Sequence, residues 1–135
     1  MQHIKIKPWV PLAEQAEIGH NRWHPDLPFL TSVKPGEEIL IESLDFLDAQ
    51  IKDTDDISDV KNVDLTRAHP LTGPFYVEGA EPGDLLVIDL LDIQPISDVG
   101  FSGVFAKENG GGFLADYFPE ADKAIWDLKG LFATS

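Results

Sequence analysis

The sequence contains no cysteine, and this absence excludes a disulfide framework and a cysteine nucleophile within its 135 residues. Basic residues are also scarce: ten Lys and Arg stand against 24 Asp and Glu, which gives a formal charge of −14. Nucleic acids and anionic membrane surfaces both attract proteins through clustered basic residues. We therefore expect neither of them as a partner.

Long hydrophobic runs are missing as well. No apolar stretch approaches the ~20 residues that a membrane-spanning helix needs. The first residues, Met1 to Trp9, are charged and lack the apolar centre of a signal peptide, so the expected location is the cytoplasm. A hydrophobic content of 43% with 10% aromatic residues nevertheless predicts a folded domain with a core.

Two common functional motifs are absent. No Gly-x-Ser-x-Gly sequence occurs, and no serine has an evident partner base, so a serine triad is not expected. The acidic run from Asp53 to Asp59 resembles a calcium-binding loop, but it lacks the glycine and the closing glutamate of an EF-hand. We interpret this run as a solvated acidic loop.

A weak internal repeat is present. Lys34–Phe46 aligns with Glu81–Ile93, and each copy is a Pro-Gly turn followed by an apolar segment. Proline presets φ for such a turn and glycine accepts the positive φ of a type II turn, so each copy predicts a strand that starts at a turn. The second copy is apolar on both faces except for Asp89, which is typical of a central strand. Either the copies are equivalent strands on facing sheets, or they share only a common turn.

The predicted fold is mainly β. Four prolines interrupt residues 1–30, which we expect to form an extended N-terminal arm. Residues 31–135 are predicted to form a domain resembling a β-sandwich or jelly roll. Its C-terminal end is expected to be incomplete, because Leu131–Ser135 resembles the start of another strand.

One short helix is predicted near the C-terminus, at about residues 120–129. Ala121, Ala124, Ile125 and Leu128 follow helical spacing and would form one apolar face. A proline precedes this segment and a glycine follows it, as is common at helix starts and ends.

The turn-rich segment from His69 to Asp84 is the first candidate site. Turns beside a buried strand hold polar groups in fixed directions. His69 and Glu78 could converge with Asp45 on a divalent metal ion, either zinc or calcium, and activate water for hydrolysis. The spacing matches no zinc signature. His69 as an ordinary loop residue, and Glu78 as a solvent-facing carboxylate, remain open alternatives.

The second candidate is the loop from Lys107 through Asn109 to the glycines Gly110 and Gly111. Glycines allow backbone N–H groups to point at a small ligand, and a lysine near Glu78 could stabilise an oxyanion. The alternative is a flexible hairpin. Trp23, together with His24, is a candidate for lining a substrate pocket, although packing within the extended arm is the favoured interpretation of His24.

A series of blocks resembles the acetamidase/formamidase family, in the family's order and over nearly the whole chain. They are Asn21–Asp26, Val33–Glu37, Asn62–Asp64, Val77–Asp84, Phe105–Gly112 and Phe118–Ala121. The later blocks are more similar to formamidases than to acetamidases. Family members are much longer, so the resemblance implies that this sequence is the N-terminal part of such an enzyme.

Three functions follow as hypotheses. The resemblance implies an amidohydrolase that converts a small neutral amide to a carboxylate and ammonia. Glu78, His69 and Lys107 would then be catalytic, and Asn109, Gly110, Gly111 and Trp23 would bind substrate, with Asp45 and Asn62 as supporting polar groups. The alternative is a non-catalytic β-sandwich interaction module, or a subunit fragment that needs a partner chain, either in a homo-oligomer or with the rest of the enzyme. A sugar-binding or other small-molecule-binding sandwich is the third hypothesis.

Overall fold

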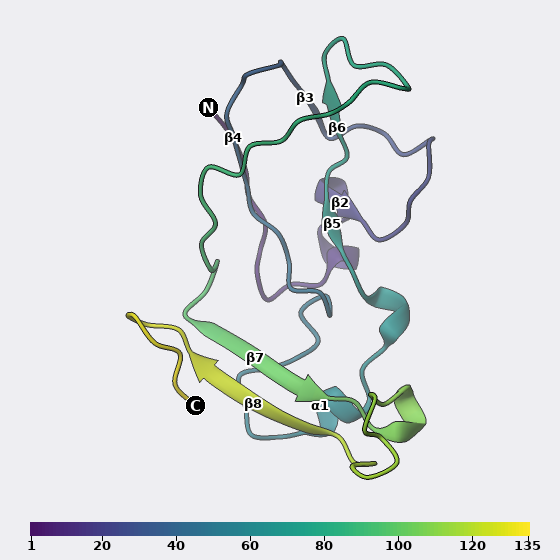
Figure 1. The fold of residues 1–135 in the computed structure, drawn as a ribbon, viewed down its shortest axis with the longest axis vertical. Helices are drawn as coiled ribbons and strands as arrows, with labels where there is room; N and C mark the ends of the chain where they lie inside the picture. The colour runs from purple at the N-terminus through teal and green to yellow at the C-terminus, as the bar shows by residue number, and fades with distance from the viewer.

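The computed structural model describes residues 1–135, and short β-strands are its main regular elements (Figure 1). The strands are β1 Gln2–Ile4, β2 Gly19–His20, β3 Thr31–Val33, β4 Ile39–Ile41, β5 Leu71–Thr72, β6 Phe75–Val77, β7 Val99–Val104 and β8 Asp122–Asp127. The helical elements are the 3₁₀ turns η1 Leu12–Glu14, η2 Ala16–Ile18, η3 Leu65–Arg67 and η4 Lys107–Asn109, and the α-helix α1 Ser58–Lys61.

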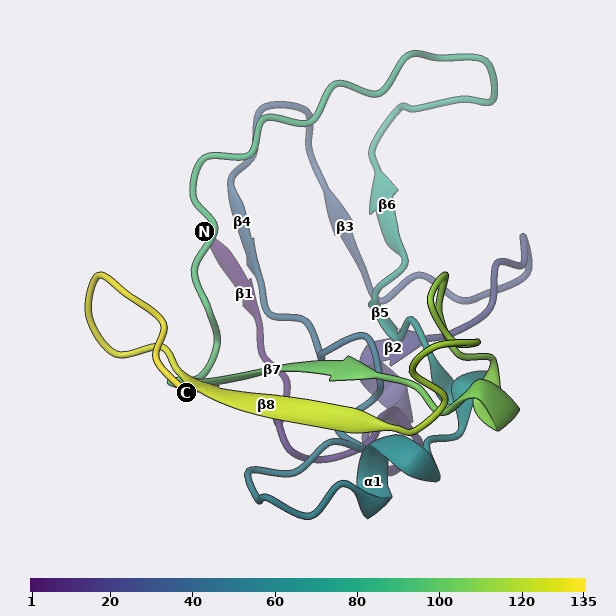
Figure 2. The same ribbon diagram turned by 60° about the horizontal axis from the view of Figure 1, so that its bottom comes forward.

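The strands form four separate two-stranded sheets. β1 pairs with β4 and β3 with β6, both in parallel, whereas β2 pairs with β5 and β7 with β8 in antiparallel fashion. The predicted mainly β class is confirmed, but residues 1–135 alone show no sandwich or jelly roll. In Figure 2, β1, β4, β3 and β6 stand beside one another, and the long β7–β8 pair crosses below them.

The first residues of the chain are held by strand pairing and by one carboxylate. β1 lies along β4, and Glu42, just after β4, accepts hydrogen bonds from the Ile6 N–H (3.0 Å) and from His3 Nε2 (2.8 Å). The hydrogen bond from Ile6 outweighs the cost of burial and holds the pKa of Glu42 below its ordinary value. Glu42 therefore fixes the entry of the N-terminal segment onto β4.

The helix predicted at about residues 120–129 is wrong. The chain instead forms β8, which pairs with β7 in a register that places Ile125 opposite Phe101 and Trp126 opposite Gly100. Trp126 Nε1 also donates to Ser102 Oγ across the pair at 3.0 Å. Isoleucine and tryptophan favour strands, and the six paired positions of β7 provide a partner that helical spacing within one segment does not reveal.

The core is small and gathers residues from the turn before α1, from α1 and its end, and from the chain that flanks β7 and β8. Only 12 of 135 residues are buried, so few side chains hold the fold together. The cluster consists of Leu47, Ile51, Val60, Val63, Ala106 and Ala121. Asp45 stabilises the turn that carries Leu47 into this cluster, because its carboxylate accepts hydrogen bonds from the N–H groups of Leu47 (2.9 Å) and Ala49 (2.8 Å).

Two strands expected from the sequence do not form as predicted. The first repeat copy does contain a strand, β4, but the apolar segment after Gly83 in the second copy forms none. Residues 131–135 contribute a single antiparallel bridge between Thr134 and Asp127. No helix of the structure has the length and apolar composition that crossing a membrane requires.

Candidate active site

Glu78 and Lys107 do not meet in the structure. Glu78 follows β6 and is exposed, and its backbone N–H donates to the Val33 carbonyl at 2.9 Å. Lys107 begins η4, and its Nζ pairs with Asp116 Oδ1 at 2.6 Å instead of with Glu78. The exposed Lys107 ammonium has three N–H donors, so two remain available to a ligand.

His69 and Asp45 lie in neighbouring turns but do not form a metal site. The His69 N–H donates to the carbonyl of Phe46 at 2.7 Å, and their rings lie 6.1 Å apart between centroids. Both oxygens of Asp45 are used by the turn to residues 47 and 49. No group of three or more His, Cys, Asp or Glu side chains in residues 1–135 is placed to hold a metal ion. The predicted ligands Asp45, His69 and Glu78 are thus not brought together by residues 1–135 alone, and we derive no metal-dependent step.

The loop after Lys107 is fastened to the core and leaves one glycine N–H free. Asn109 Nδ2 donates to the Val63 carbonyl at 3.0 Å and so fastens the loop to the core. Gly110 has φ of 93° and Gly111 of 53°. The Gly111 N–H donates to the Ala106 carbonyl at 3.0 Å, whereas the Gly110 N–H has no partner within the chain. Gly110 is thus free to donate to a ligand oxygen.

Trp23 takes no part in any of these arrangements. It lies between β2 and β3 with its side chain 89% exposed and lines neither of the two main cavities. Its predicted role in substrate binding therefore has no support from the geometry of residues 1–135.

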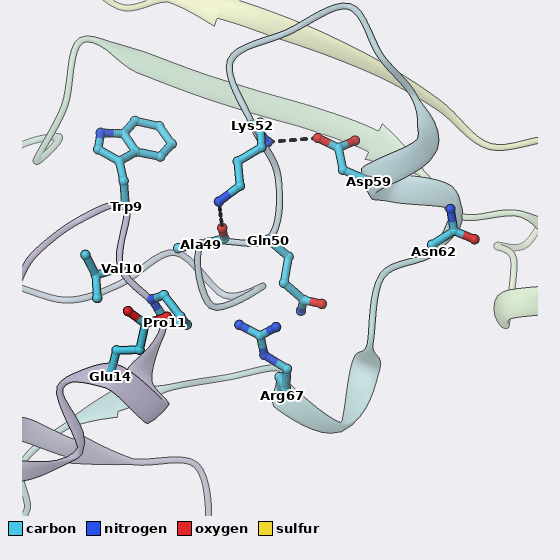
Figure 3. A pocket seen from close by; sticks show the side chains of 10 residues that line it. All are labelled: Trp9, Val10, Pro11, Glu14, Ala49, Gln50, Lys52, Asp59, Asn62 and Arg67. Atoms are coloured by element: carbon cyan, nitrogen blue, oxygen red, sulfur yellow. Dashed lines mark hydrogen bonds between the residues drawn. The ribbon is translucent and has the colours of Figure 1, made fainter.

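A cavity of about 490 Å³ lies elsewhere, beside the turn at residues 48–52 (Figure 3). We call it the main cavity. It is lined by Trp9, Val10, Pro11, Glu14, Ala49, Gln50, Lys52, Asp59, Asn62 and Arg67. Of these residues, the sequence analysis singled out Asn62, as a supporting polar group, and Asp59, as part of the acidic run. The others come from segments that only the fold brings together.

Arg67 forms the polar floor of the main cavity through its contact with Asp48. Arg67 Nη2 lies 2.8 Å from Asp48 Oδ2, and its Nε donates to the same oxygen at 2.9 Å. Asp48 is 3% exposed, and it also accepts the N–H of Leu12 at 2.6 Å. Such a buried carboxylate is stable only with partners of this kind.

The backbone beside this ion pair is strained. Asp48 has φ of 59° and Ala49 of 58°, values that residues other than glycine seldom adopt. Strained conformations persist only where the surrounding structure enforces them, and they cluster at functional sites. The turn carrying Asp48 and Ala49 is therefore a feature beside the main cavity that sequence reasoning missed, since alanine gives no signal of a left-handed conformation.

The opposite wall is held by Asp59, in α1. Burial alone would raise the pKa of Asp59, but hydrogen bonds from Lys123 Nζ (2.8 Å) and from the N–H groups of Lys52 (2.8 Å) and Val60 (2.7 Å) outweigh it and lower that pKa. Asp59 is therefore a structural anion. The acidic run that contains it is only partly the solvated loop predicted from the sequence.

Two cationic side chains of the main cavity have hydrogen-bond donors without a partner. Lys52 Nζ uses one donor on the Ala49 carbonyl (2.7 Å), and Arg67 Nη1 has no partner within the chain. Both cationic groups line the same cavity as the Glu14 carboxylate (Figure 3). Donors of this kind suit a carbonyl oxygen or a small carboxylate.

A second cavity, of about 300 Å³, is lined in part by a histidine with an unpartnered ring nitrogen. Ala16, Glu17, Gly19, His20, Leu27, Pro28, Phe29, Leu30, Gly73 and Pro74 line it. His20 Nδ1 is buried and has no hydrogen-bond partner. Buried polar atoms are usually satisfied, so this nitrogen has capacity for one more hydrogen bond.

Comparison with known proteins gives a consistent result. Residues 5–135 match the Acetamidase/Formamidase family. The chain is 56% identical over 131 residues to the formamidase of Methylophilus methylotrophus, covering 96% of this chain and 31% of that protein. It is 53% identical over 133 residues to the acetamidase of Mycolicibacterium smegmatis, covering 92% of this chain and 33% of that protein.

A solved structure shows the same similarity in three dimensions. The gamma lactamase from Delftia acidovorans superposes with a TM-score of 0.88 at 46% sequence identity, covering 99% of this chain and 33% of that one. The chain thus spans about a third of the length of the proteins it matches.

Proposed function

Because the chain belongs to the acetamidase/formamidase family, we propose that it is part of an amidohydrolase that converts a short aliphatic amide to a carboxylate and ammonia. The observation that carries this proposal is the 56% identity over 131 residues to a formamidase. The names of the relatives all refer to cleavage of the C–N bond of a small amide. Formamide and acetamide are linear amides, whereas a γ-lactam is a cyclic one.

The proposed chemistry is attack of water on the amide carbonyl. Glu78 would take the proton from water and His69 would deliver a proton to the departing nitrogen. Lys107, with two donors left, and the free N–H of Gly110 would stabilise the oxyanion. Since Glu78 and Lys107 are apart in residues 1–135, these assignments rest on residue type and on position in the family blocks.

Glu78→Gln tests this assignment. The assay is ammonia release from formamide by the family-length enzyme, and the matched control is Glu81→Gln, another exposed carboxylate of the same turn. Glutamine keeps the size but cannot accept the proton, so Glu78→Gln should lose turnover while the control keeps it. Near-full activity of Glu78→Gln would remove this residue from the mechanism.

We further propose that the four small sheets belong to a larger sandwich or jelly roll, completed in a homo-oligomer or with the remainder of a family-length protein. Two-stranded sheets are marginal alone, which supports their extension by further strands. Native mass spectrometry, with the masses then read under denaturing conditions, tests this. A larger companion polypeptide or several copies would support it, and a lone monomer would contradict it.

A further inference from the structure

An apolar segment lies open to solvent along one side of the molecule, where the chain descends from the loop after β6 to the start of β7 (Figures 1 and 2). We call Leu85–Ile96 the apolar strip. Seven of its large side chains are at least 57% exposed: Leu85, Leu86, Val87, Ile88, Leu90, Leu91 and Ile93. No backbone N–H or C=O in the strip takes part in a hydrogen bond.

Its sequence is nevertheless that of a strand. Leu85, Val87 and Leu91 would point to one side of an extended chain, and Leu86, Ile88 and Leu90 to the other. Apolar residues on both sides are typical of a strand buried on both faces. The first copy of the repeat, which is less apolar, already forms a paired strand, β4 with β1. The second copy has the sequence of a strand as well, so what it lacks within residues 1–135 is a partner strand.

From this we infer that Leu85–Leu91 is a central strand whose two edges are completed by strands from the polypeptide that makes up the other two thirds of family-length proteins. The occupant follows from length, since the relatives are about three times as long as this chain. A second copy of the chain is a poorer occupant, because each copy carries a charge of −14. The inference rests on the part of the proposed function that assigns the chain to a larger protein, and not on amide hydrolysis.

The test is coexpression of the tagged chain with the part of the Methylophilus methylotrophus formamidase that it does not match. The wild-type chain should capture this polypeptide. Hydrogen exchange at Leu86–Leu91 should slow from the rate of an unprotected peptide to that of a folded strand. Exchange of the chain alone gives the reference.

Val87→Lys and Ile88→Lys probe the two faces. Their side chains are 74% and 71% exposed, so the isolated chain should keep its circular dichroism and unfolding midpoint. Burial of an unpaired lysine should reduce capture about tenfold or more. The matched control is Ile57→Lys, outside the strip and 42% exposed, which should capture normally.

Absence of capture by the wild-type chain, or equal capture by Val87→Lys, overturns the inference. Protection of the strip in the chain alone together with a dimer in sedimentation also overturns it, because the occupant is then a second copy. A protected strip in an assembly that releases no ammonia from formamide supports the inference and contradicts the proposed activity. An unprotected strip in an assembly that releases ammonia from formamide supports the proposed activity and overturns the inference.

Discussion

Replacing Lys123 with methionine would remove the positive end of a buried ion pair that fastens β8 to α1. Lys123 Nζ lies 2.8 Å from Asp59 Oδ2 and 3.2 Å from the Lys52 carbonyl. The Lys123 side chain is 2% exposed and that of Asp59 is 15% exposed. Methionine preserves most of the apolar stem, so the change is confined to the charge and its hydrogen bonds.

The structure sets the expected magnitude. Removing one partner of a buried ion pair typically lowers the free energy of unfolding by about 3–5 kcal/mol, because an uncompensated charge stays behind. Asp59 keeps two N–H donors and some contact with water, so we expect the lower end, about 3 kcal/mol. Adding Asp59→Asn should recover about half of this loss, since it neutralises the stranded carboxylate.

Urea unfolding of the variants measures these differences. Lys129→Met is the matched control: its Nζ lies 3.9 Å from Asp127 and its side chain is 67% exposed, so it should cost about 0–0.5 kcal/mol. If Lys123→Met and Lys129→Met agree to within about 1 kcal/mol, the ion pair does not stabilise β8 in the way described.

The same pair predicts a pH dependence. The pKa of Asp59 in the folded chain lies below its ordinary value of 3.8. Its contribution to stability is thus complete above pH 3.8 and is lost as the pH falls through the folded pKa. In Lys123→Met the lowering effect of the ammonium is lost, so the pKa of Asp59 should be higher than in the wild type and protonation relieves the stranded charge. The urea midpoints of the two proteins should converge as the pH falls below 3.8.

Two further predictions concern packing. Gly111→Ala should lower the unfolding free energy by about 1–3 kcal/mol, because the residue has φ of 53° and a Cβ would lie 2.6 Å from that of Ala115; Gly112→Ala, with open space around it, should match wild type in the same urea titration. Leu47→Ala should cost about 2–5 kcal/mol in calorimetry, because this core side chain is 1% exposed, and a loss below about 1 kcal/mol would mean that the core relaxes around the cavity.

Sequence patterns predicted elements whose conformation depends on neighbouring residues, and they failed where pairing with a distant segment determines the secondary structure. The Pro-Gly turn before β4 could be recognised because its chemistry lies within four residues. The segment containing Ala121 and Ile125 satisfied helical spacing, yet the partner that makes it a strand lies in β7. The apolar strip is the opposite case: the residues favour a strand, and no partner is present within residues 1–135.

Some parts of the candidate site could likewise be recognised from the sequence, and others only from the fold. The glycine loop could be recognised, because glycines and a lysine stand together in the sequence, and its role in substrate binding stays a prediction. The main cavity could not be, since Arg67 meets Asp48 across 19 residues and neither stands in a recognisable motif. Residue type suggested that Glu78 and Lys107 pair, but the fold gives Lys107 a nearer carboxylate, Asp116.

The make-up of the small core has a consequence for synthesis on the ribosome. Leu47, Ile51, Val60 and Val63 are translated early, whereas Ala106 and Ala121, which close the cluster, come about 40 and 60 residues later. Until then a nascent chain carries an open apolar surface and an Asp59 without its lysine. We therefore expect folding of this region to be completed only after β8 is synthesised, and a chaperone that covers Leu47 during that interval should protect the growing chain from aggregation.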